Sequence, residues 1–326
     1  MNTGLPMNKL TLQDVLMARA RISPYIVRTP LLRHLSLDEF VGTKVFVKHE
    51  NYQKLGSFKV RGGLNLFSQM NQEELNKGVS TASSGNHGQS IAYGAKIFGA
   101  KSIIVVPEGA NTGKVRSMLN LGAEVVYHGE HFGIADEYIR GHSIDQGYRY
   151  VNAVEEIELY AGVGTYAVEI MEDLPNVDVI IVPIGGGSGA CGTCIVAKSI
   201  NPSIQVIGVQ ASLAPAAYNS WVSGKLEKAP MESTAEGLAT NMGYEPAQSI
   251  LRELLDDFVL VSDNEMEDAI LMYLEHTRNL VEHAGAASLA AALKIKDRIR
   301  NKNVVLVVSG GNLSMGNLKV IMEKYS

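Results

Sequence analysis

The strongest constraint on this chain is the alternation of short β-branched runs with amphipathic or alanine-rich segments along its 326 residues. Continuous apolar runs are typical of strands buried on both faces, and the intervening helices supply the crossovers that parallel strands need. The pattern predicts strands at 44–48, 102–107, 124–127, 177–183, 205–210, 258–261 and 304–309. It predicts helices at 12–22, 88–98, 112–120, 160–174, 189–199, 265–278 and 284–298.

These elements predict an α/β protein with mostly parallel, twisted sheets flanked by helices. Thr11 followed three positions later by Asp14 is a capping pattern, which predicts the start of the first helix. A chain of this length is long for one compact core, so we expect two lobes. No repeat, low-complexity tract or long linker marks the boundary between them.

Composition and charge exclude several classes of partner. A net charge of −5 with mixed signs gives no electrostatic footprint for nucleic acid. No apolar run approaches the roughly 18 residues of a membrane-spanning helix, and residues 1–14 lack the basic and apolar regions of a signal peptide. Cys191 and Cys194 cannot form a disulfide framework. We therefore expect a cytoplasmic protein that binds neither nucleic acid nor membrane.

The two cysteines form a C-x-x-C pattern, which can indicate redox or metal chemistry. Cys191 lies in the first turn of a predicted helix, directly after a glycine-rich loop, and this position favours small packed side chains. The histidines show no spacing typical of a metal site. The sequence predicts no metal centre.

Lys59 is the first residue that indicates chemistry. It follows Gly56-Ser57-Phe58 and opens a stretch with apolar residues at helical spacing. A lysine at the start of a partly buried helix can be desolvated and neutral, as a nucleophilic amine must be. Most lysines in such positions are structural, so the interpretation depends on what the fold places around it.

Two loops have the chemistry of anion sites. The first contains Ser83, Ser84, Gly85, Asn86 and His87 and precedes a helix, where backbone N–H groups and the helix dipole favour a carboxylate. A plain N-cap turn is the alternative. The second loop follows a strand and also precedes a helix, and its glycines allow the backbone to approach a phosphate. It consists of Gly185, Gly186, Gly187, Ser188 and Gly189.

The glycine loop also resembles a loose dinucleotide fingerprint. The acidic residue expected at the end of the next strand is absent, however, because Gln210 stands there. Despite this missing acidic residue, the glycine spacing keeps a nicotinamide-dependent oxidoreductase as an alternative. A protein that only binds a ligand is another alternative. A last candidate, Ser309, follows an apolar strand and precedes Gly310-Gly311-Asn312, where it would point into a ligand crevice.

Together these segments resemble the fold type II pyridoxal-phosphate enzymes, specifically the serine/threonine dehydratase and serine racemase family. The resemblance runs from Arg28-Thr29-Pro30-Leu31 through the Lys59 and Asn86 motifs to Ser309-Gly310-Gly311-Asn312. It implies a two-domain fold like that of the tryptophan synthase β subunit. The large cofactor-binding domain would comprise residues 1–50 and 152–326, and the small domain residues 51–151. It also implies a homodimer.

The resemblance assigns roles to the candidate residues. Lys59 would form the Schiff base with pyridoxal phosphate and take the substrate α-proton, while Phe58 would pack beside the ring. Asn86 would bond the ring hydroxyl, and Ser309 would face the ring nitrogen. The phosphate would lie on Gly185, Gly186, Gly187, Ser188 and Gly189, and the substrate carboxylate on Ser83, Ser84, Asn86 and His87.

The reaction implied is elimination of water from a β-hydroxy L-amino acid such as serine or threonine, which gives a 2-oxo acid and ammonia. A serine beside the ring nitrogen leaves that nitrogen largely unprotonated, which favours loss of a β-leaving group. The alternative is an amino acid racemase on the same cofactor, because racemases of this family use a serine at the position of Ser84 as their second base.

Two of the departures from the family bear on the substrate and on metal dependence. Racemases carry an arginine that aligns with Ala135, and the neighbouring Phe132 is apolar, which predicts a larger pocket that accepts a substrate such as phenylserine. The family's divalent-cation site uses two carboxylates where this chain has Gln210 and Ala216. Without them a hard cation loses most of its attraction, so we expect no metal dependence.

Overall fold

Two parallel-rich sheets organise the chain, as the alternation of strands and helices predicts. The structure is a computed structural model that describes residues 10–324. The prediction that the chain has no signal peptide concerns residues 1–14, and residues 1–9 lie outside the described residues. In the part of the chain that is described, no helix is long and apolar enough to cross a membrane.

The larger sheet is parallel except at one edge. Its order is β1 (Leu31–Arg33), β2 (Lys44–His49), β10 (Asn303–Val308), β7 (Val179–Pro183), β8 (Gln205–Ala211) and β9 (Asp257–Val261), and only β1 runs antiparallel to its neighbour. In the centre of this sheet Val305 pairs with both Phe46 of β2 and Ile180 of β7. The strand nearest the C-terminus therefore lies between strands from the beginning and the middle of the sequence.

The smaller sheet is parallel throughout. Its order is β5 (Glu124–Tyr127), β4 (Ser102–Val106), β3 (Val79–Ala82) and β6 (Arg149–Tyr150). Four helices accompany it: α4 (Gln72–Lys77), α5 (Asn86–Phe98), α6 (Thr112–Asn120) and α7 (Phe132–Gln146). We call this sheet and these helices the small lobe, and the larger sheet with its covering helices the large lobe.

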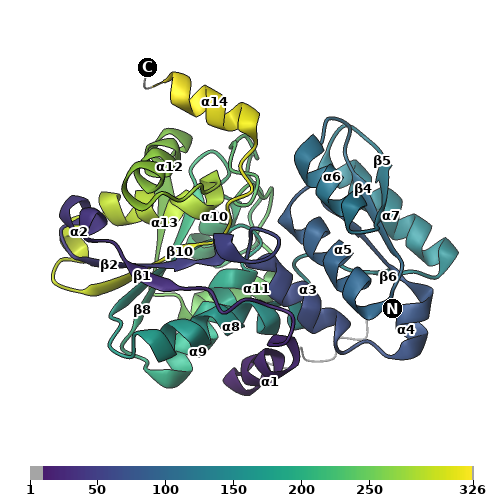
Figure 1. Ribbon diagram of the computed structural model, residues 1–326, viewed down its shortest axis with the longest axis horizontal. Helices are drawn as coiled ribbons and strands as arrows, with labels where there is room; N and C mark the ends of the chain where they lie inside the picture. Colours follow the sequence, from purple (N-terminus) through teal and green to yellow (C-terminus); the bar gives the residue numbers. More distant parts are fainter. Residues whose placement is uncertain (1–9, 325–326) are drawn as a thin grey trace.

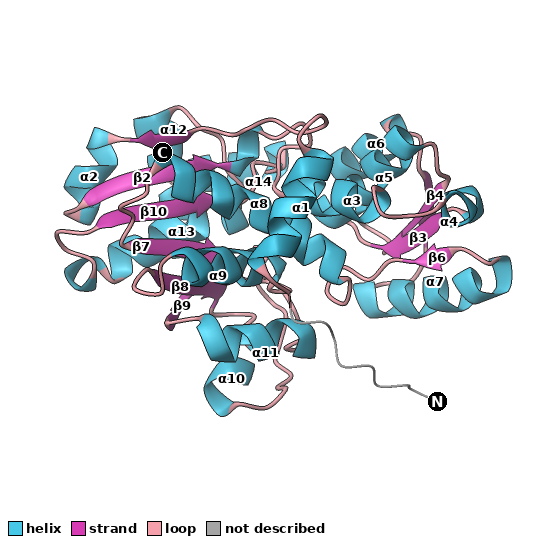
Figure 2. Cartoon of the chain, turned by 90° about the horizontal axis from the view of Figure 1, so that it is seen from below, coloured by secondary structure: helices cyan, strands magenta, loops and turns pink. Residues whose placement is uncertain are grey.

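The large lobe contains most of the remaining helices. They are α1 (Leu12–Ile22), α2 (Leu35–Val41), α8 (Ile157–Asp173), α9 (Ser188–Ile200), α10 (Ala216–Ser223), α11 (Glu245–Leu254), α12 (Asp263–Thr277), α13 (His283–Lys294) and α14 (Met315–Glu323), with short 3-10 turns at Glu50–Tyr52 and Lys296–Arg298. One further helix, α3 (Lys59–Phe67), lies between the two sheets (Figures 1 and 2).

Both faces of the large sheet are buried because alternate strand residues point to opposite sides. Ile180 and Val182 pack in the core formed with α1, α8 and α9, whereas Val179 and Ile181 pack in the core formed with α2, α12 and α13. This explains why its inner strands read as continuous apolar runs. The small sheet is covered by α5 and α6 on one face and by α7 on the other.

The predicted strands correspond to strands of the structure, with ends shifted by up to two residues. The predicted ranges leave out the short strands β1, β3 and β6 and the helices α2, α4, α7, α10, α11 and α14. The apolar pattern of α7 is obscured because Ile144 is 83% exposed, while the buried side of the helix consists of Ala135, Ile139 and Ser143. The predicted domain boundaries at 50/51 and 151/152 remain a prediction, since α3 packs against both α5 and α8.

Candidate active site

Lys59 is the first residue of α3, and its side chain reaches the start of α9. The Lys59 Nζ donates a hydrogen bond to the Oγ of Ser188 at 3.2 Å and lies 5.2 Å from the centre of the Phe58 ring. The Phe58 ring in turn packs edge-on against Tyr166 of α8. The structure thus brings the candidate lysine to the loop that the sequence predicts to bind phosphate.

The environment of the Lys59 amine favours its neutral form. The residue as a whole is only partly buried, but protein atoms surround the amine, and this burial lowers the pKa of Lys59 to about 8. At pH 7 about a tenth of such an amine is neutral, against less than about one in a thousand for an unperturbed lysine. Lys59 is therefore suited to act as a nucleophile or base near neutral pH.

The glycine loop connects β7 to α9 and is tightly packed. Gly187 has a φ of 95°, a conformation that residues with a side chain rarely adopt. A Cβ at Gly185 would lie 2.2 Å from the carbonyl oxygen of Gly237. Because α9 begins at Ser188, its first N–H groups have no partner within the helix and favour an anion. The loop therefore fits a phosphate group.

Ser309 lies at the carboxyl end of β10, next to the segment that carries Lys59. The Phe58 backbone N–H donates to the Ser309 carbonyl oxygen at 3.1 Å, and Ser57 forms a bridge with Gly310. Ser309 is buried. The order of the strands thus places the last predicted site residue beside the first, although 250 positions separate Ser309 from Lys59 in the sequence.

The predicted carboxylate loop connects β3 to α5. The Ser83 Oγ accepts hydrogen bonds from the backbone N–H groups of Gly85 (3.2 Å) and Gly88 (3.1 Å), so this side chain shapes the loop. Ser84 is partly exposed, and α5 begins two residues later, at Asn86. The loop presents the amino-terminal end of α5, as an anion site requires. The binding roles of Ser83 and Ser84 remain predictions.

Asn86 is connected to the large lobe through both atoms of its amide. Its Nδ2 donates to the Glu282 carboxylate at 2.6 Å, and its Oδ1 accepts from the Asn312 side chain at 2.7 Å. Burial raises the pKa of Glu282 despite the nearby Lys114 ammonium. No motif in the sequence points to Glu282 or Lys114. For Asn312 a signal was present, because it closes the Ser-Gly-Gly-Asn motif.

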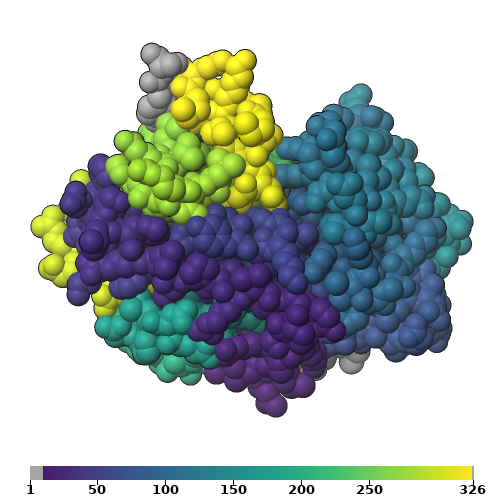
Figure 3. Space-filling view, in the orientation of Figure 1, coloured from purple at the N-terminus to yellow at the C-terminus, as the bar shows by residue number. Residues whose placement is uncertain are grey.

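The surface has a notch between the lobes, at the end where α6 and α14 are found (Figure 3). A pocket there is lined by residues of both lobes, among them Asn111, Lys114, Glu236, Glu282 and Asn317. The Lys114 ammonium of α6 lies 2.5 Å from the Glu236 carboxylate, so a salt bridge crosses from one lobe to the other.

His87 is a buried histidine with an unused ring nitrogen. Burial, together with the charge of nearby Lys59, lowers the pKa of His87 to about 3, so the ring is neutral. Its Nε2 has no hydrogen-bond partner among the described residues. Buried polar atoms are nearly always paired, so this nitrogen marks a place where a bound group could supply the partner.

The structure contradicts the use of Ala135 as the counterpart of the racemase arginine in the prediction of a larger pocket. Ala135 is fully buried in the core of the small lobe, where it packs with Ala82, Ile103 and Ile139. It belongs to the side of α7 that faces the sheet, so it cannot replace an arginine at the substrate. Phe132, at the first residue of α7, is 43% exposed. Its contact with a substrate remains a prediction.

Gln210 is held by protein groups at the end of β8. Its Oε1 accepts from the Tyr218 backbone N–H at 3.0 Å, and its Nε2 donates to the Leu238 carbonyl oxygen and the Thr240 hydroxyl, both at 3.4 Å. Ala216 is buried at the start of α10. Residues 10–324 contain no cluster of three or more histidine, cysteine or acidic side chains that could hold a metal.

The two cysteines are buried side chains of α9, as predicted. Both are free thiols, and burial raises the pKa of Cys191 and that of Cys194. A thiol with a raised pKa forms little thiolate, which is the reactive species.

A family model described as "Pyridoxal-phosphate dependent enzyme" matches residues 22–310. The chain belongs to this family. Its cofactor is therefore pyridoxal phosphate, and the nicotinamide alternative is set aside. The pyridoxal-phosphate-dependent enzyme is 37% identical over 316 residues to the L-threonine ammonia-lyase of Thermotoga maritima, which covers 97% of this chain and 79% of that enzyme. It is 35% identical over 323 residues to the serine racemase of Dictyostelium discoideum, with coverage of 98% and 99%.

Solved structures agree with this assignment. The maize serine racemase structure superposes on this pyridoxal-phosphate-dependent enzyme with a TM-score of 0.91 at 34% identity, covering 97% of this chain and 98% of that one. The fold is therefore that of the fold type II enzymes.

The residues of the site fit the cofactor. A buried amine with a lowered pKa, Lys59, lies at the start of a helix that can bind phosphate, α9. Within the part of the chain that the structure describes, a buried ring nitrogen of His87 has no hydrogen-bond partner. The glycine loop could hold the phosphate, Lys59 the aldehyde carbon and Ser309 the ring nitrogen.

Proposed function

We propose that this protein is a pyridoxal-phosphate-dependent dehydratase, an ammonia-lyase that eliminates water from a β-hydroxy L-amino acid to give a 2-oxo acid and ammonia. The observation that carries the proposal is the buried Lys59 amine, with its pKa of about 8, hydrogen-bonded to Ser188 at the start of α9. The similarity to a threonine ammonia-lyase supports the reaction class.

The bound cofactor supplies an electron sink for the negative charge that develops at the substrate α-carbon. The chain's own residues bind and orient the reactants. The glycine loop and the start of α9 hold the phosphate, while the start of α5, with Ser83, Ser84, Asn86 and His87, binds the substrate carboxylate. Lys59 accepts the α-proton at Nζ, which its lowered pKa permits near neutral pH.

Serine and threonine are the first substrates to test, since the relatives are named for them. Phenylserine is the bulkier candidate. Because Ala135 lies in the core, only the apolar side chain of Phe132 supports a pocket large enough for this substrate. If phenylserine turns over no faster than serine or threonine, the prediction of a pocket enlarged at Phe132 is wrong.

A second candidate function is amino acid racemisation. Ser84 favours it, because a hydroxyl in the carboxylate loop could deliver a proton from the side opposite Lys59. The similarity over nearly the whole chain to a serine racemase also supports it. Comparing the rate of 2-oxo acid release with the rate of D-enantiomer formation on L-serine decides between the two functions.

The decisive experiment on the chemistry uses Lys59→Ala. The purified native protein should show a visible absorption band from the lysine-bound cofactor and release 2-oxo acid from a β-hydroxy amino acid. Lys59→Ala should lose the band and lower turnover about 100-fold or more. A native protein that stays colourless with added pyridoxal phosphate would contradict the proposal.

We also propose that the protein is cytoplasmic, as its composition predicts, and that it is a homodimer with a small domain at residues 51–151, as the family resemblance implies. Light scattering of the holoenzyme measures its mass, and a monomeric mass rejects the dimer. Limited proteolysis that cuts near positions 50 and 151 would support the domain boundaries.

A further inference from the structure

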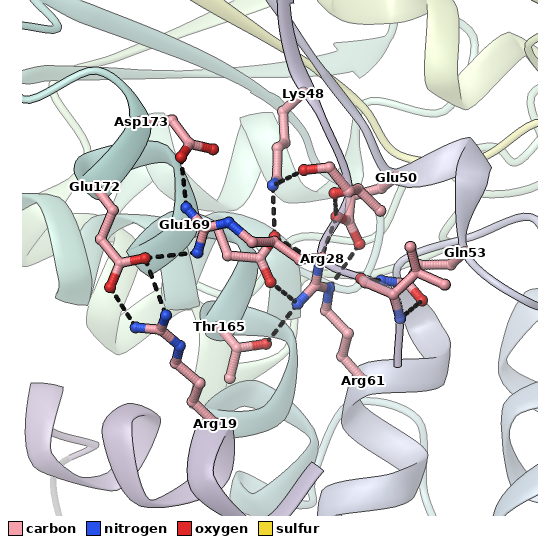
Figure 4. Close-up of polar contacts among 12 residues, drawn as sticks. Arg19, Arg28, Lys48, Glu50, Gln53, Arg61, Thr165, Glu169, Glu172 and Asp173 are labelled. Atoms are coloured by element: carbon pink, nitrogen blue, oxygen red, sulfur yellow. Dashed lines mark hydrogen bonds and ion pairs between the residues drawn. The ribbon is translucent and has the colours of Figure 1, made fainter. Parts of the chain in front are cut away.

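A cluster of buried charges lies against the helix that carries Lys59 (Figure 4). Its charged members are Lys48 of β2, Glu50 at the end of that strand, Arg61 of α3 and Glu169 of α8. The first three are fully buried, and Glu169 is 3% exposed. The cluster holds two cations and two carboxylates, so its formal charge is zero.

Arg61 is the centre of this cluster and uses each of its five N–H donors. Its Nε and one terminal nitrogen bond both oxygens of Glu50 at 2.7 and 2.8 Å. The same terminal nitrogen donates to Glu169 at 3.0 Å. The other terminal nitrogen donates to Glu169 at 2.8 Å and to the Thr165 hydroxyl at 3.1 Å. Lysine has no planar fork and could not make this set.

The cluster contains a second cation besides Arg61, the Lys48 ammonium. The Lys48 ammonium donates to the Glu169 carboxylate at 2.5 Å and to the Thr29 carbonyl oxygen at 2.7 Å. Lys48 therefore connects the larger sheet to α8, and the shared carboxylate of Glu169 connects both to Arg61 of α3. Buried ion clusters add little net stability, because desolvation offsets most of the attraction between the charges. Net stability therefore does not explain why this cluster is present, whereas a role in holding α3 in a fixed position does.

Arg61 is two residues after Lys59, and side chains two positions apart point to opposite sides of a helix. Arg61 thus anchors one side of α3 while Lys59 faces the site from the other. One further contact holds the helix, because the Ser90 hydroxyl of α5 donates to the Lys59 carbonyl oxygen at 2.6 Å. The helix α8 also packs closely on α3, since a Cβ added at Gly162 would lie 2.5 Å from the Arg61 carbonyl oxygen.

We propose that Arg61 is a positioning residue for Lys59, and that its five hydrogen bonds to Glu50, Glu169 and Thr165 hold α3 where the Lys59 amine stays enclosed beside Ser188. The inference rests on the proposed function in one respect, namely that Lys59 is the amine that bonds the cofactor. Because burial alone lowers the Lys59 pKa, movement of α3 that admits water to the amine must raise it.

The test measures the pKa of Lys59 directly, in protein freed of cofactor. Trace labelling with acetic anhydride over a range of pH, followed by mass spectrometry of the Lys59 peptide, reports the fraction of neutral amine. Arg61→Lys keeps the charge but loses the fork. It should raise the Lys59 pKa by about one unit, which slows labelling at pH 7 about tenfold. Cofactor affinity, measured by absorbance titration, should fall about tenfold or more.

Two other variants make the result interpretable. Thr165→Val removes one acceptor without changing charge, and it should slow Lys59 labelling about two- to threefold. Arg28→Lys is the matched control. Arg28 pairs with Glu172 and Asp173 on the same helix α8, but its side chain is 46% exposed. The control should leave both the labelling profile and the cofactor affinity unchanged.

A folded Arg61→Lys with native labelling and native affinity overturns the proposal. If Arg61→Lys does not fold, Thr165→Val decides, and native labelling in that variant overturns the proposal equally. The labelling does not depend on turnover, so failure of the dehydratase assignment would appear separately, as a native enzyme that releases no 2-oxo acid.

Discussion

The Lys59 amine donates a hydrogen bond to the Ser188 hydroxyl across 3.2 Å, although 129 positions separate the two residues. Lys59 opens α3, whereas Ser188 opens α9 at the end of the glycine loop. The contact therefore joins the candidate nucleophile to the candidate phosphate site. It also gives the amine one defined acceptor in an environment that otherwise disfavours its charge.

Replacing Ser188 tests this contact. The hydroxyl oxygen accepts from the ammonium form and stabilises it, so Ser188→Ala should lower the Lys59 pKa from about 8 toward 7. A lost hydrogen bond of about 1 kcal/mol corresponds to roughly 0.7 of a pKa unit. Trace labelling of the cofactor-free protein measures the change. An unchanged Lys59 pKa in Ser188→Ala would show that the hydrogen bond does not stabilise the ammonium form.

The lowered Lys59 pKa predicts how cofactor capture depends on pH. Bond formation with an aldehyde requires the neutral amine, so the rate at which the cofactor-free protein binds pyridoxal phosphate should rise as the pH increases through about 8. Stopped-flow absorbance from pH 6 to 11 measures the profile. A profile that keeps rising beyond pH 10 would show an unperturbed lysine.

Ser84→Ala separates elimination from racemisation. If Ser84 is the second base, removing its hydroxyl should reduce D-enantiomer formation about 100-fold or more, while 2-oxo acid release changes little. Chiral chromatography of L-serine reactions and a keto acid assay on the same samples measure both rates. Equal loss of both activities would instead point to a role in binding the substrate carboxylate.

His87 predicts sensitivity to acid. Its pKa is about 3 in the folded protein, below the roughly 6.5 of an unfolded chain, so the unfolded state binds the proton more readily. The contribution of His87 is therefore full above pH 6.5 and is lost as the pH falls toward 3. Between pH 7 and 5 the free energy of unfolding should fall by about 2 kcal/mol on account of His87. Denaturant titrations of native protein and His87→Gln measure it, and parallel pH profiles for the two would contradict the prediction.

Gln210 predicts independence from divalent cations. Its amide is already bonded to Tyr218, Leu238 and Thr240, and it offers no negative charge. Dialysis against a chelator should leave turnover within about twofold of its starting value, and added magnesium should not raise it. Turnover that is lost on chelation and restored by magnesium would show that other groups hold an activating cation.

Much of the site could be predicted because its residues lie in local motifs. Glycines between a strand and a helix, as at Gly187, indicate an anion site whatever the rest of the fold does. The capping pattern at Thr11 is equally local, and the structure confirms it. The resemblance to the pyridoxal-phosphate enzymes used the same short motifs, and the family match confirms the cofactor.

The errors occurred where distant residues decide the environment. Ala135 aligns with the arginine of racemases, but packing against Ile103 puts it in the core. Arg61 reads as an ordinary helix charge, and its carboxylate partners come from two other elements. Glu282 gave no signal either, because it meets Asn86 only when the two lobes are assembled.

The sequence by itself determined much of the order of strands and helices and the glycine loop, and it singled out Lys59 as the candidate cofactor lysine, because periodicity and turn residues act over a few neighbouring positions. The tertiary structure alone decided that Lys59 meets Ser188, that Arg61 has five acceptors and that a ring nitrogen of His87 has no partner within residues 10–324. The physical reason is that the order of the strands within each sheet, not their order in the chain, sets which loops share an edge. Burial there then fixes the Lys59 pKa.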